Sequence, residues 1–267
     1  FTFWRRVIEV TEMSSLIISG LNKTYISPNT AQRVVFDNFS LEIKHGSIVA
    51  IIGANGCGKT TLLNCIAGLV QYDKGGIKID DKDDHDNIGF IFQNYRETLL
   101  PWLKNIDNIA CTFDQPNFSK SEKHNYIRHW ADEHKIVLPW EAYPYQCSGG
   151  QQQLLALVRE FINQPKLLLM DEPFTALDYE KRLAWRQRVE TLWEKHPTTV
   201  ILVSHDIEEA IYLADEVIVF GNQPTKIFGH HKIDIPRPRT PILLQSEKFF
   251  QYHRAVLQSF FQATPKI

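Results

Sequence analysis

The sequence predicts an α/β fold with a mostly parallel β-sheet at its core and an inserted helical subdomain. Short apolar runs such as GSIVAIIG, KLLLMDEP and TTVILVSH alternate with segments of helical periodicity, which is typical of a parallel sheet covered by helices. From about residue 100 to residue 165 the pattern is helical throughout. We therefore expect this helical block to be inserted between two halves of the sheet.

The individual elements follow from the spacing of apolar residues and from the turn residues between them. We expect strands over residues 16–25, 33–43, 46–53, 75–80, 87–93, 166–173, 198–205 and 215–221. We expect helices over residues 60–69, 105–113, 125–136, 152–162, 179–196, 206–214 and 246–261. Residues 230–241 are expected to form a Pro-rich linker, with His230 and His231 in an exposed loop.

The composition is that of an ordinary globular protein of 267 residues. The 29 Lys+Arg and 31 Asp+Glu residues give a formal net charge of −2, which argues against nucleic-acid binding through bulk charge. The four cysteines include no CxxC pair, so we expect a reduced, cytosolic chain without a disulfide or zinc framework. No apolar run approaches the roughly 18 residues that span a bilayer.

Two segments are expected to carry no chemistry. The N-terminal residues FTFWRRVIEVTEM lack the apolar core and cleavage site of a signal peptide. Met13 is a candidate start, and residues 1–14 are treated as an extension. The acidic stretch DDKDDHD, from Asp80 to Asp86, is interpreted as a solvated turn rather than a metal site.

A phosphate-binding loop is the clearest motif. GANGCGKTT fits the pattern Gly-x-x-x-x-Gly-Lys-Thr between an expected strand and an expected helix, which is the context that the motif requires. The glycines let backbone N–H groups surround the nucleotide phosphates, Lys59 adds a positive charge, and the Thr60 hydroxyl is a ligand for Mg²⁺. We therefore expect a P-loop NTPase with ATP and Mg²⁺ as cofactors, and these nucleotide-binding residues: Gly53, Asn55, Gly56, Cys57, Gly58, Lys59, Thr60 and Thr61.

Two acidic residues follow the apolar strand LLLM. We expect Asp171 to hold Mg²⁺, directly or through water, and Glu172 to polarise the attacking water as a general base. An acidic strand end is also common in α/β folds without this function. The phosphate loop upstream favours the catalytic interpretation.

QCSGGQQQLLAL contains a second corner suited to a phosphate. Ser148 and Gln151 have the spacing of a capping box, so a helix is expected to begin here. Gly149 and Gly150 expose backbone N–H groups at that helix N-terminus, where the dipole attracts anions. The corner has no lysine, so the phosphate that it holds needs another source of charge.

Six motifs occur in one order: Gly53–Thr60, Phe92-Gln93, Ser148–Gln151, LLLMDEP, Ala176–Asp178 and Ser204-His205. This combination resembles the ATP-binding subunit of ABC transporters over residues 15 to 229. The resemblance implies a P-loop NTPase of the ABC type, with an antiparallel β subdomain beside the parallel core. It also implies three parts: an N-terminal extension (1–14), an ATPase domain (15–229, helical subdomain about 100–165) and a C-terminal linker and helix (230–267).

The resemblance explains why the chain has two phosphate corners. In this family two ATPase domains dimerise head to tail, and each ATP lies between the phosphate loop of one copy and the signature corner of the other. Ser148, Gly149, Gly150 and Gln151 are thereby implied to hold the γ-phosphate of ATP on the partner. Cys147 replaces the usual leucine before the signature, and Leu154 replaces an arginine, but neither change touches the implied γ-phosphate contacts.

The resemblance assigns further roles to single residues. Tyr25 either stacks on adenine or is a packed strand tyrosine. Gln93 is implied to contact Mg²⁺ and the attacking water, His205 to contact the γ-phosphate, and Asp178 to lie at the dimer seam. The catalytic residues are thus Glu172, His205 and Gln93, and the metal ligands are Thr60, Gln93 and Asp171.

LLPW followed by a helix beginning NI, and RPR at Arg237–Arg239, are similar to importers of nitrate, alkanesulfonates, taurine and related solutes. This implies an ATPase of a bacterial importer at the cytoplasmic face of the inner membrane, with a separate integral membrane permease and a periplasmic or lipoprotein solute-binding protein. Pro101 and Trp102 either lie in the permease-binding groove or form a rigid, packed turn.

The sequence is compatible with several alternatives for the solute, the dimer and the function. A pyrimidine precursor of thiamine is also a solute of this family, and the dimer is either a homodimer or a heterodimer. A second candidate function is that of a soluble ABC ATPase that acts on nucleic acid. Such proteins usually have two ATPase units in one chain or a long coiled-coil insertion, and often basic extensions. The third is a catalytically silent subunit, against which Lys59, Asp171, Glu172 and His205 argue. We therefore expect no nucleic-acid partner.

Overall fold

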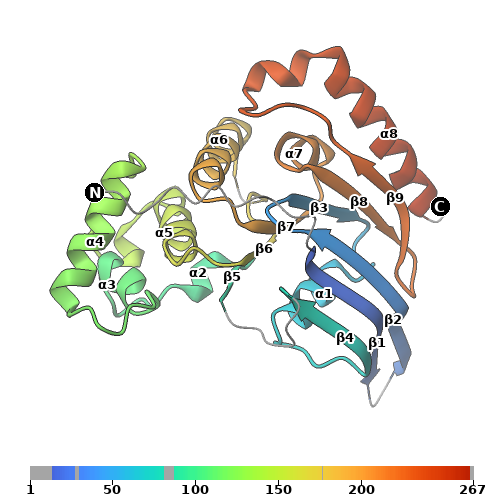
Figure 1. Cartoon of the computed structure of the whole chain (residues 1–267), viewed down its shortest axis with the longest axis horizontal. Helices are drawn as coiled ribbons and strands as arrows, with labels where there is room; N and C mark the ends of the chain where they lie inside the picture. Colours follow the sequence, from blue (N-terminus) through green and yellow to red (C-terminus); the bar gives the residue numbers. More distant parts are fainter. Residues whose placement is uncertain (1–13, 28–29, 81–86, 176, 265–267) are drawn as a thin grey trace.

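A six-stranded sheet forms the centre of the molecule in the computed structural model, which describes residues 14–27, 30–80, 87–175 and 177–264 (Figure 1). The β5–β6, β6–β7, β7–β3 and β3–β8 pairs are parallel, and only β9 pairs antiparallel, with β8. The predicted mostly parallel sheet is therefore confirmed. Its order is β5 (Ile88–Ile91), β6 (Leu167–Asp171), β7 (Thr199–Ser204), β3 (Ile48–Gly53), β8 (Glu216–Gly221) and β9 (Lys226–Lys232).

A three-stranded antiparallel sheet covers one face of the central sheet, together with helix α1 (Lys59–Ile66). Its strands are β1 (Ser14–Ser27), β2 (Thr30–Lys44) and β4 (Lys74–Ile79), with β1 in the middle. The antiparallel β subdomain is therefore present. The first strand begins at Ser14, one residue before the expected domain start.

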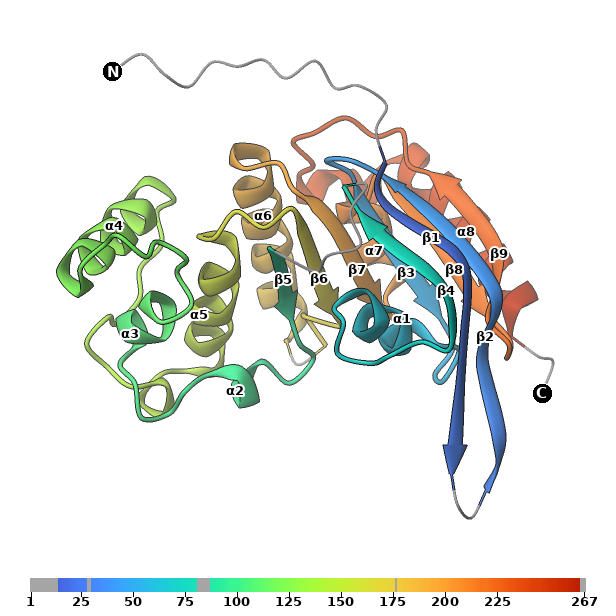
Figure 2. The same ribbon diagram turned by 60° about the horizontal axis from the view of Figure 1, so that its bottom comes forward.

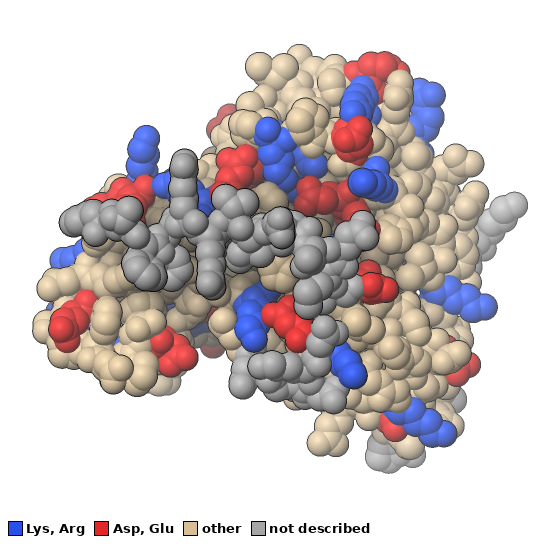
Figure 3. All heavy atoms as spheres, viewed as in Figure 1, with Lys and Arg blue, Asp and Glu red and all other residues tan. Residues whose placement is uncertain are grey.

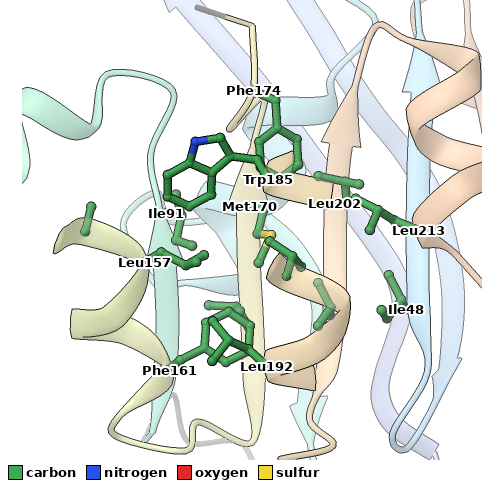
Figure 4. Packing of buried hydrophobic residues seen from close by; sticks show 14 of the residues in the cluster. Ile48, Ile91, Leu157, Phe161, Met170, Phe174, Trp185, Leu192, Leu202 and Leu213 are labelled. Atoms are coloured by element: carbon green, nitrogen blue, oxygen red, sulfur yellow. The ribbon is translucent and has the colours of Figure 1, made fainter. Parts of the chain in front are cut away.

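Side chains alternate between two cores because successive residues of a strand point to opposite faces of the sheet. On β3, Ile48, Ala50 and Ile52 belong to one buried cluster, and Val49 and Ile51 belong to the other. Both faces are therefore covered, which explains the unbroken apolar runs in the central strands. Figure 4 shows the first cluster, where residues of β6 and β7 meet side chains from helices on either side.

The second face is covered by α6 (Tyr179–Lys195), α7 (Ile207–Leu213) and α8 (Glu247–Ala263). Trp185 of α6 is buried in this cluster, and Trp193 packs against it while partly exposed. Burial of each large apolar side chain stabilises the fold by about 1.5–3 kcal/mol relative to exposure. The helices and the sheet are thus held as one packed unit.

The helical subdomain lies at the end of the molecule opposite the β1–β2 hairpin (Figures 1 and 2). It contains α2 (Tyr95–Thr98), α3 (Asn105–Ala110), α4 (Lys120–Glu133) and α5 (Gly149–Phe161), with a 3-10 turn over Pro144–Gln146. Helix α3 ends three residues before the expected end. Helix α4 begins five residues before the expected start, because Ser119 and Glu122 form a capping box there.

The C-terminal region differs from the expected linker. His230 and His231 lie in strand β9, so their assignment to a loop is wrong. The expected boundary between residues 229 and 230 falls inside this strand. The Arg239 guanidinium donates hydrogen bonds to the carbonyls of Ile211, Tyr212 and Ala214, and thereby caps the end of α7.

Among the described residues, every helix is too short or too polar to cross a bilayer. Residues 1–13 and most of the acidic stretch, residues 81–86, lie outside the described residues. The two expectations for those segments therefore stay predictions.

Candidate nucleotide-binding site

The phosphate loop connects β3 to α1 through a turn that only glycine accommodates at two positions. Gly58 has a φ of 108°, and a Cβ there would lie 2.6 Å from Thr225 Oγ1. A Cβ on Gly53 would lie 2.5 Å from the Phe220 carbonyl oxygen. The loop is therefore fixed by a left-handed backbone and by close approach of the neighbouring strand.

Lys59 begins α1 and turns its side chain back over the loop. Its ammonium donates to the carbonyl oxygens of Gly53 at 2.8 Å and Ala54 at 3.1 Å, and the residue is 5% exposed. An ammonium has three donors, so two of them hold the loop and one is left for an anion in the pocket. A buried cation beside a helix N-terminus is a strong attractor of phosphate.

Asp171, at the end of β6, faces the start of α1. Its carboxylate accepts a hydrogen bond from the Thr60 hydroxyl, and burial raises its pKa although Thr60 and Lys59 oppose the shift. Its Oδ1 atom is buried without a hydrogen-bond partner among the described residues. Carboxylate and hydroxyl oxygens are the ligands that Mg²⁺ prefers. The pair Thr60–Asp171 therefore fits a Mg²⁺ ion that takes its remaining ligands from phosphate and water, although no cluster of three or more metal-ligating side chains occurs among the residues described.

Gln93, Glu172 and His205 come together beside this pair. They follow β5, β6 and β7, and the carboxyl ends of adjacent parallel strands meet at one edge of a sheet, where ligands bind in such folds. Gln93 Nε2 donates to Glu172 Oε2 at 3.0 Å, and His205 Nε2 contacts the other carboxylate oxygen, Glu172 Oε1. Glu172 has a φ of 48°, an uncommon conformation for a residue with a side chain and one found at functional sites.

Of these three residues, Glu172 lines a pocket of about 260 Å³ that is large enough for part of a nucleotide, whereas His205 lines a neighbouring pocket with Arg182 and Asp206. Tyr25, 40% exposed, forms one side of the Glu172 pocket and offers an aromatic face. Arg33 and Val35 line the pocket as well, and sequence motifs did not identify them. The lining residues are Tyr25, Arg33, Val35, Asn55, Gly56, Gly58, Lys59, Thr60, Thr61 and Glu172.

Arg33 lies directly opposite Tyr25 in the β1–β2 pair. Its guanidinium donates to the Gly56 carbonyl oxygen at 3.0 Å and to Gln223 Oε1 at 3.0 Å. The signal that could have found it is the strand register, because residues opposite each other on an antiparallel pair share one face. A second cation therefore stands at the phosphate loop.

Cys57 does not line the pocket. Its side chain is buried in the core beneath the loop, and burial raises the pKa of its thiol. It therefore contributes through its backbone alone.

The signature corner is formed as the sequence predicts, but it does not line the pocket of its own chain. Ser148 Oγ accepts from the Gln151 N–H at 3.3 Å, and Gln151 Oε1 accepts from the Ser148 N–H at 2.9 Å. A Cβ on Gly150 would meet no atom within 4 Å, so the surface there is open to close approach by another molecule. Asp178, the N-cap of α6, also lies outside the lining of the pocket.

Cys147 and Leu154, the two departures from the signature pattern, have local partners. Asn105 Nδ2 donates to Cys147 Sγ at 3.0 Å, and Leu154 packs against the main core. Both replacements are thus accommodated without changing the capping box at Ser148.

A phosphate loop, a Thr–Asp pair and a glutamate at the carboxyl edge of a parallel sheet define a P-loop nucleoside triphosphatase. The family model for ABC transporters matches residues 36–175. The chain belongs to the ABC transporter family and is one of its ATPase subunits.

Two relatives match nearly their whole length. The chain is 36% identical over 246 residues to the aliphatic sulfonates import ATP-binding protein SsuB of Bacillus cereus, covering 91% of this chain and 94% of that protein. It is 31% identical over 257 residues to the nitrate transport protein NasD of Klebsiella oxytoca, covering 93% and 97%. The chain therefore resembles the ATPases of sulfonate and nitrate import systems.

The fold also matches a solved structure with nucleotide bound. The dimeric ATP-binding cassette MJ0796, in a post-hydrolysis state with ADP and Pi, has a TM-score of 0.71 and 27% identity, covering 83% of this chain and all 100% of that chain.

Proposed function

We propose that this chain hydrolyses ATP as the motor of a bacterial importer, and that two copies close head to tail around Mg-ATP. The observation that carries the proposal is the separation of the two phosphate corners. Lys59 lies at one, and the open N-terminus of α5 at Ser148 lies at the other, outside the pocket that Lys59 lines. In the proposed dimer, the α5 N-terminus of one copy completes the phosphate site that Lys59 forms in the other copy.

The residues of the pocket divide the chemistry among them. Lys59 and the loop N–H groups bind the β- and γ-phosphates, Thr60 and Asp171 hold Mg²⁺, and Tyr25 stacks on adenine. The metal neutralises charge on the transferring phosphate. Glu172 takes the proton of the attacking water, while Gln93 and His205 orient its carboxylate and contact Mg²⁺ and the γ-phosphate respectively.

The permease is proposed to dock at the LLPW turn. The Asn108 side chain, fully buried, donates to the carbonyls of Leu100 and Leu103 and accepts from the Leu100 N–H. The turn is therefore rigid, yet Trp102 is 69% exposed rather than packed. An exposed tryptophan on a rigid support is suited to a protein partner. Docking there places the chain at the cytoplasmic face of the inner membrane, where it serves a periplasmic or lipoprotein solute-binding protein.

The solute is proposed to be nitrate, a sulfonate or taurine, with a pyrimidine precursor of thiamine as the remaining candidate. The named activities of the sulfonate and nitrate relatives support this class. Action on nucleic acid is less well supported, because basic and acidic side chains are interspersed on the visible face in Figure 3 and the net charge is −2.

Uptake by cells that lack this chain tests the proposal. The solute panel is nitrate, taurine, an alkanesulfonate and a hydroxymethyl-pyrimidine, with complementation by the wild type or by Glu172→Gln. We expect loss of uptake of one solute, restored by the wild type alone. Unchanged uptake of every solute would contradict the importer assignment within this solute class.

Ser148→Arg is expected to block dimer closure without weakening ATP binding to the monomer. The arginine side chain is larger than that of serine and fills the open corner beside Gly150, where the partner's phosphate is proposed to enter. ATPase activity should fall by about 100-fold or more, since an ordered contact to the reacting phosphate is lost. Steady-state ATPase and ATP titration measure the two effects, with the exposed Ser121→Arg on α4 as control. An unchanged ATPase rate would rule out the two-copy site.

A further inference from the structure

Two arginines of α6 converge on the carboxylate of Asp206, the residue that follows His205, and Arg182, His205 and Asp206 line one pocket. Arg182 and Arg186 are four residues apart and so lie on the same face of the helix. Arg182 Nη1 donates to Asp206 Oδ2 at 3.2 Å, and Arg186 Nη2 donates to the same oxygen at 3.1 Å. Arg186 Nη1 also donates to Glu208 Oε1 at 2.7 Å. These contacts tie α6 to the start of α7.

The other oxygen of Asp206 holds α7. Asp206 Oδ1 accepts from the N–H groups of Glu208 at 2.9 Å and Glu209 at 3.2 Å, which makes Asp206 the N-cap of this helix. The Asp206 N–H donates to Ser204 Oγ at 3.0 Å. His205 lies between these two fixed residues. The position of His205 is thus set in part by the Asp206 carboxylate, which accepts hydrogen bonds from Arg182 and Arg186 of α6.

Burial of the Arg186 guanidinium carries a desolvation cost that an apolar residue at this position would avoid. Arg186 is fully buried, and its Nε has no hydrogen-bond partner among the described residues. Burial also raises the pKa of the neighbouring Glu209 to about 8, although Arg186 opposes the shift. Buried ionic groups often add less stability than apolar residues of similar size would. Stability alone therefore does not explain this network, whereas a role in positioning His205 does.

We propose that Arg186 and Arg182 are positioning residues that hold His205 toward Glu172 and the γ-phosphate, acting through Asp206. The inference rests on the proposed function, because it needs ATP hydrolysis at this site. Asp178, the N-cap of α6, is proposed to lie at the dimer seam. The two arginines lie one and two turns further along, so α6 links the seam to His205.

The test is a mutant cycle between Arg186 and His205. Arg186→Gln is expected to lower kcat by about 100-fold, as displacement of a catalytic contact by about 1 Å can do, with the ATP Kd unchanged within about threefold. In a His205→Ala background the same substitution is expected to lower kcat by less than about twofold, since residues of one network are not additive. Arg186→Lys, which keeps the charge but loses the fork, should recover part of kcat.

Controls separate positioning from general damage. Arg188→Gln removes a guanidinium from the same helix and should leave kcat unchanged. If Arg186→Gln fails to fold, the partly exposed Arg182→Gln and the cap-preserving Asp206→Asn carry the same cycle, with expected losses of about tenfold. Melting temperature is measured for every variant.

Two results would overturn the proposal. One is an equal fold-loss of kcat in the wild-type and His205→Ala backgrounds, which marks a structural role only. The other is an unchanged kcat in Arg186→Gln. A wild-type protein without ATPase activity would instead contradict the proposed function itself, so the two failures are distinguishable.

Discussion

Glu172→Gln is expected to lower ATP turnover by about 10³-fold and to trap an ATP-bound dimer. The amide keeps the size of the carboxylate, and its oxygen can still accept a hydrogen bond from Gln93 Nε2. In the wild-type structure this nitrogen lies 3.0 Å from Glu172 Oε2. It cannot accept the proton of the attacking water, and a positioned base contributes about 10²–10⁴-fold to such reactions. Binding of ATP survives, because Lys59 and the phosphate loop are untouched.

The ATP-bound dimer of Glu172→Gln is expected to persist because hydrolysis is the step that opens the proposed dimer. The γ-phosphate is proposed to bridge the loop of one copy and Ser148 of the other, so the dimer opens only when that phosphate leaves. Light scattering with saturating Mg-ATP should give the mass of a dimer for Glu172→Gln and of a monomer–dimer mixture for the wild type. Single-turnover assays measure the lost chemical step.

Glu180→Gln provides the matched control, because Glu180 is an exposed glutamate on α6. It should turn over ATP at the wild-type rate and show no stable dimer. A Glu172→Gln protein that stays monomeric at saturating Mg-ATP would contradict the homodimer, and would favour pairing with a different ATPase subunit.

The sequence was sufficient to predict the parts of the site that follow strands of one sheet. Gln93, Glu172 and His205 are 79 and 33 residues apart in the chain, yet each lies within two residues of the end of a parallel strand. Parallel strands end at a common edge, so alternation of strands and helices already implies that these residues converge. The sequence motifs and the strand order therefore predict the same cluster of residues.

Arg33 could not be predicted in this way. Its place in the pocket depends on which residue of β2 lies opposite Tyr25, and a one-residue slip would turn it to the other face. That register includes several irregularities along β1 and β2, one of them between Tyr25 and Ser27. Apolar alternation fixes the face of buried residues but not the register of an exposed hairpin end.

Other differences have local causes that were present in the sequence. Ser119 and Glu122 have the capping-box spacing that correctly marked Ser148, and the same rule predicts the observed start of α4. Strand β9 has no alternation of apolar and polar residues and is mostly exposed, so only its pairing with β8 makes it a strand. Edge strands depend on such tertiary pairing more than on their own pattern.

Lys59→Ala is expected to weaken ATP binding by about 10²-fold or more. Lys59 is 5% exposed, so its hydrogen bonds to phosphate form in a partly dry site. Charge-assisted hydrogen bonds contribute about 1.5–3 kcal/mol each, and about 1.4 kcal/mol corresponds to a tenfold change in Kd. Loss of one or two such bonds, with the loop carbonyls of Gly53 and Ala54 left without their donor, gives the expected range.

Lys59→Arg separates charge from shape. The guanidinium keeps the positive charge, but a planar fork cannot replace a compact ammonium in a space that leaves Lys59 almost fully buried. We therefore expect Lys59→Arg to bind ATP nearly as weakly as Lys59→Ala. The exposed Lys44→Ala serves as the control and should bind ATP normally.

Thermal unfolding distinguishes lost binding from lost folding. A ligand at 100 times its Kd stabilises the folded state by about 2.7 kcal/mol, which raises Tm by roughly 5–10 °C in a chain of this size. The wild type should show this shift with Mg-ATP, and Lys59→Ala should show little of it while melting near the wild-type Tm without ligand. A full shift in Lys59→Ala would contradict the assignment of Lys59 to the phosphates, because ligand stabilisation requires the binding that the substitution is expected to remove.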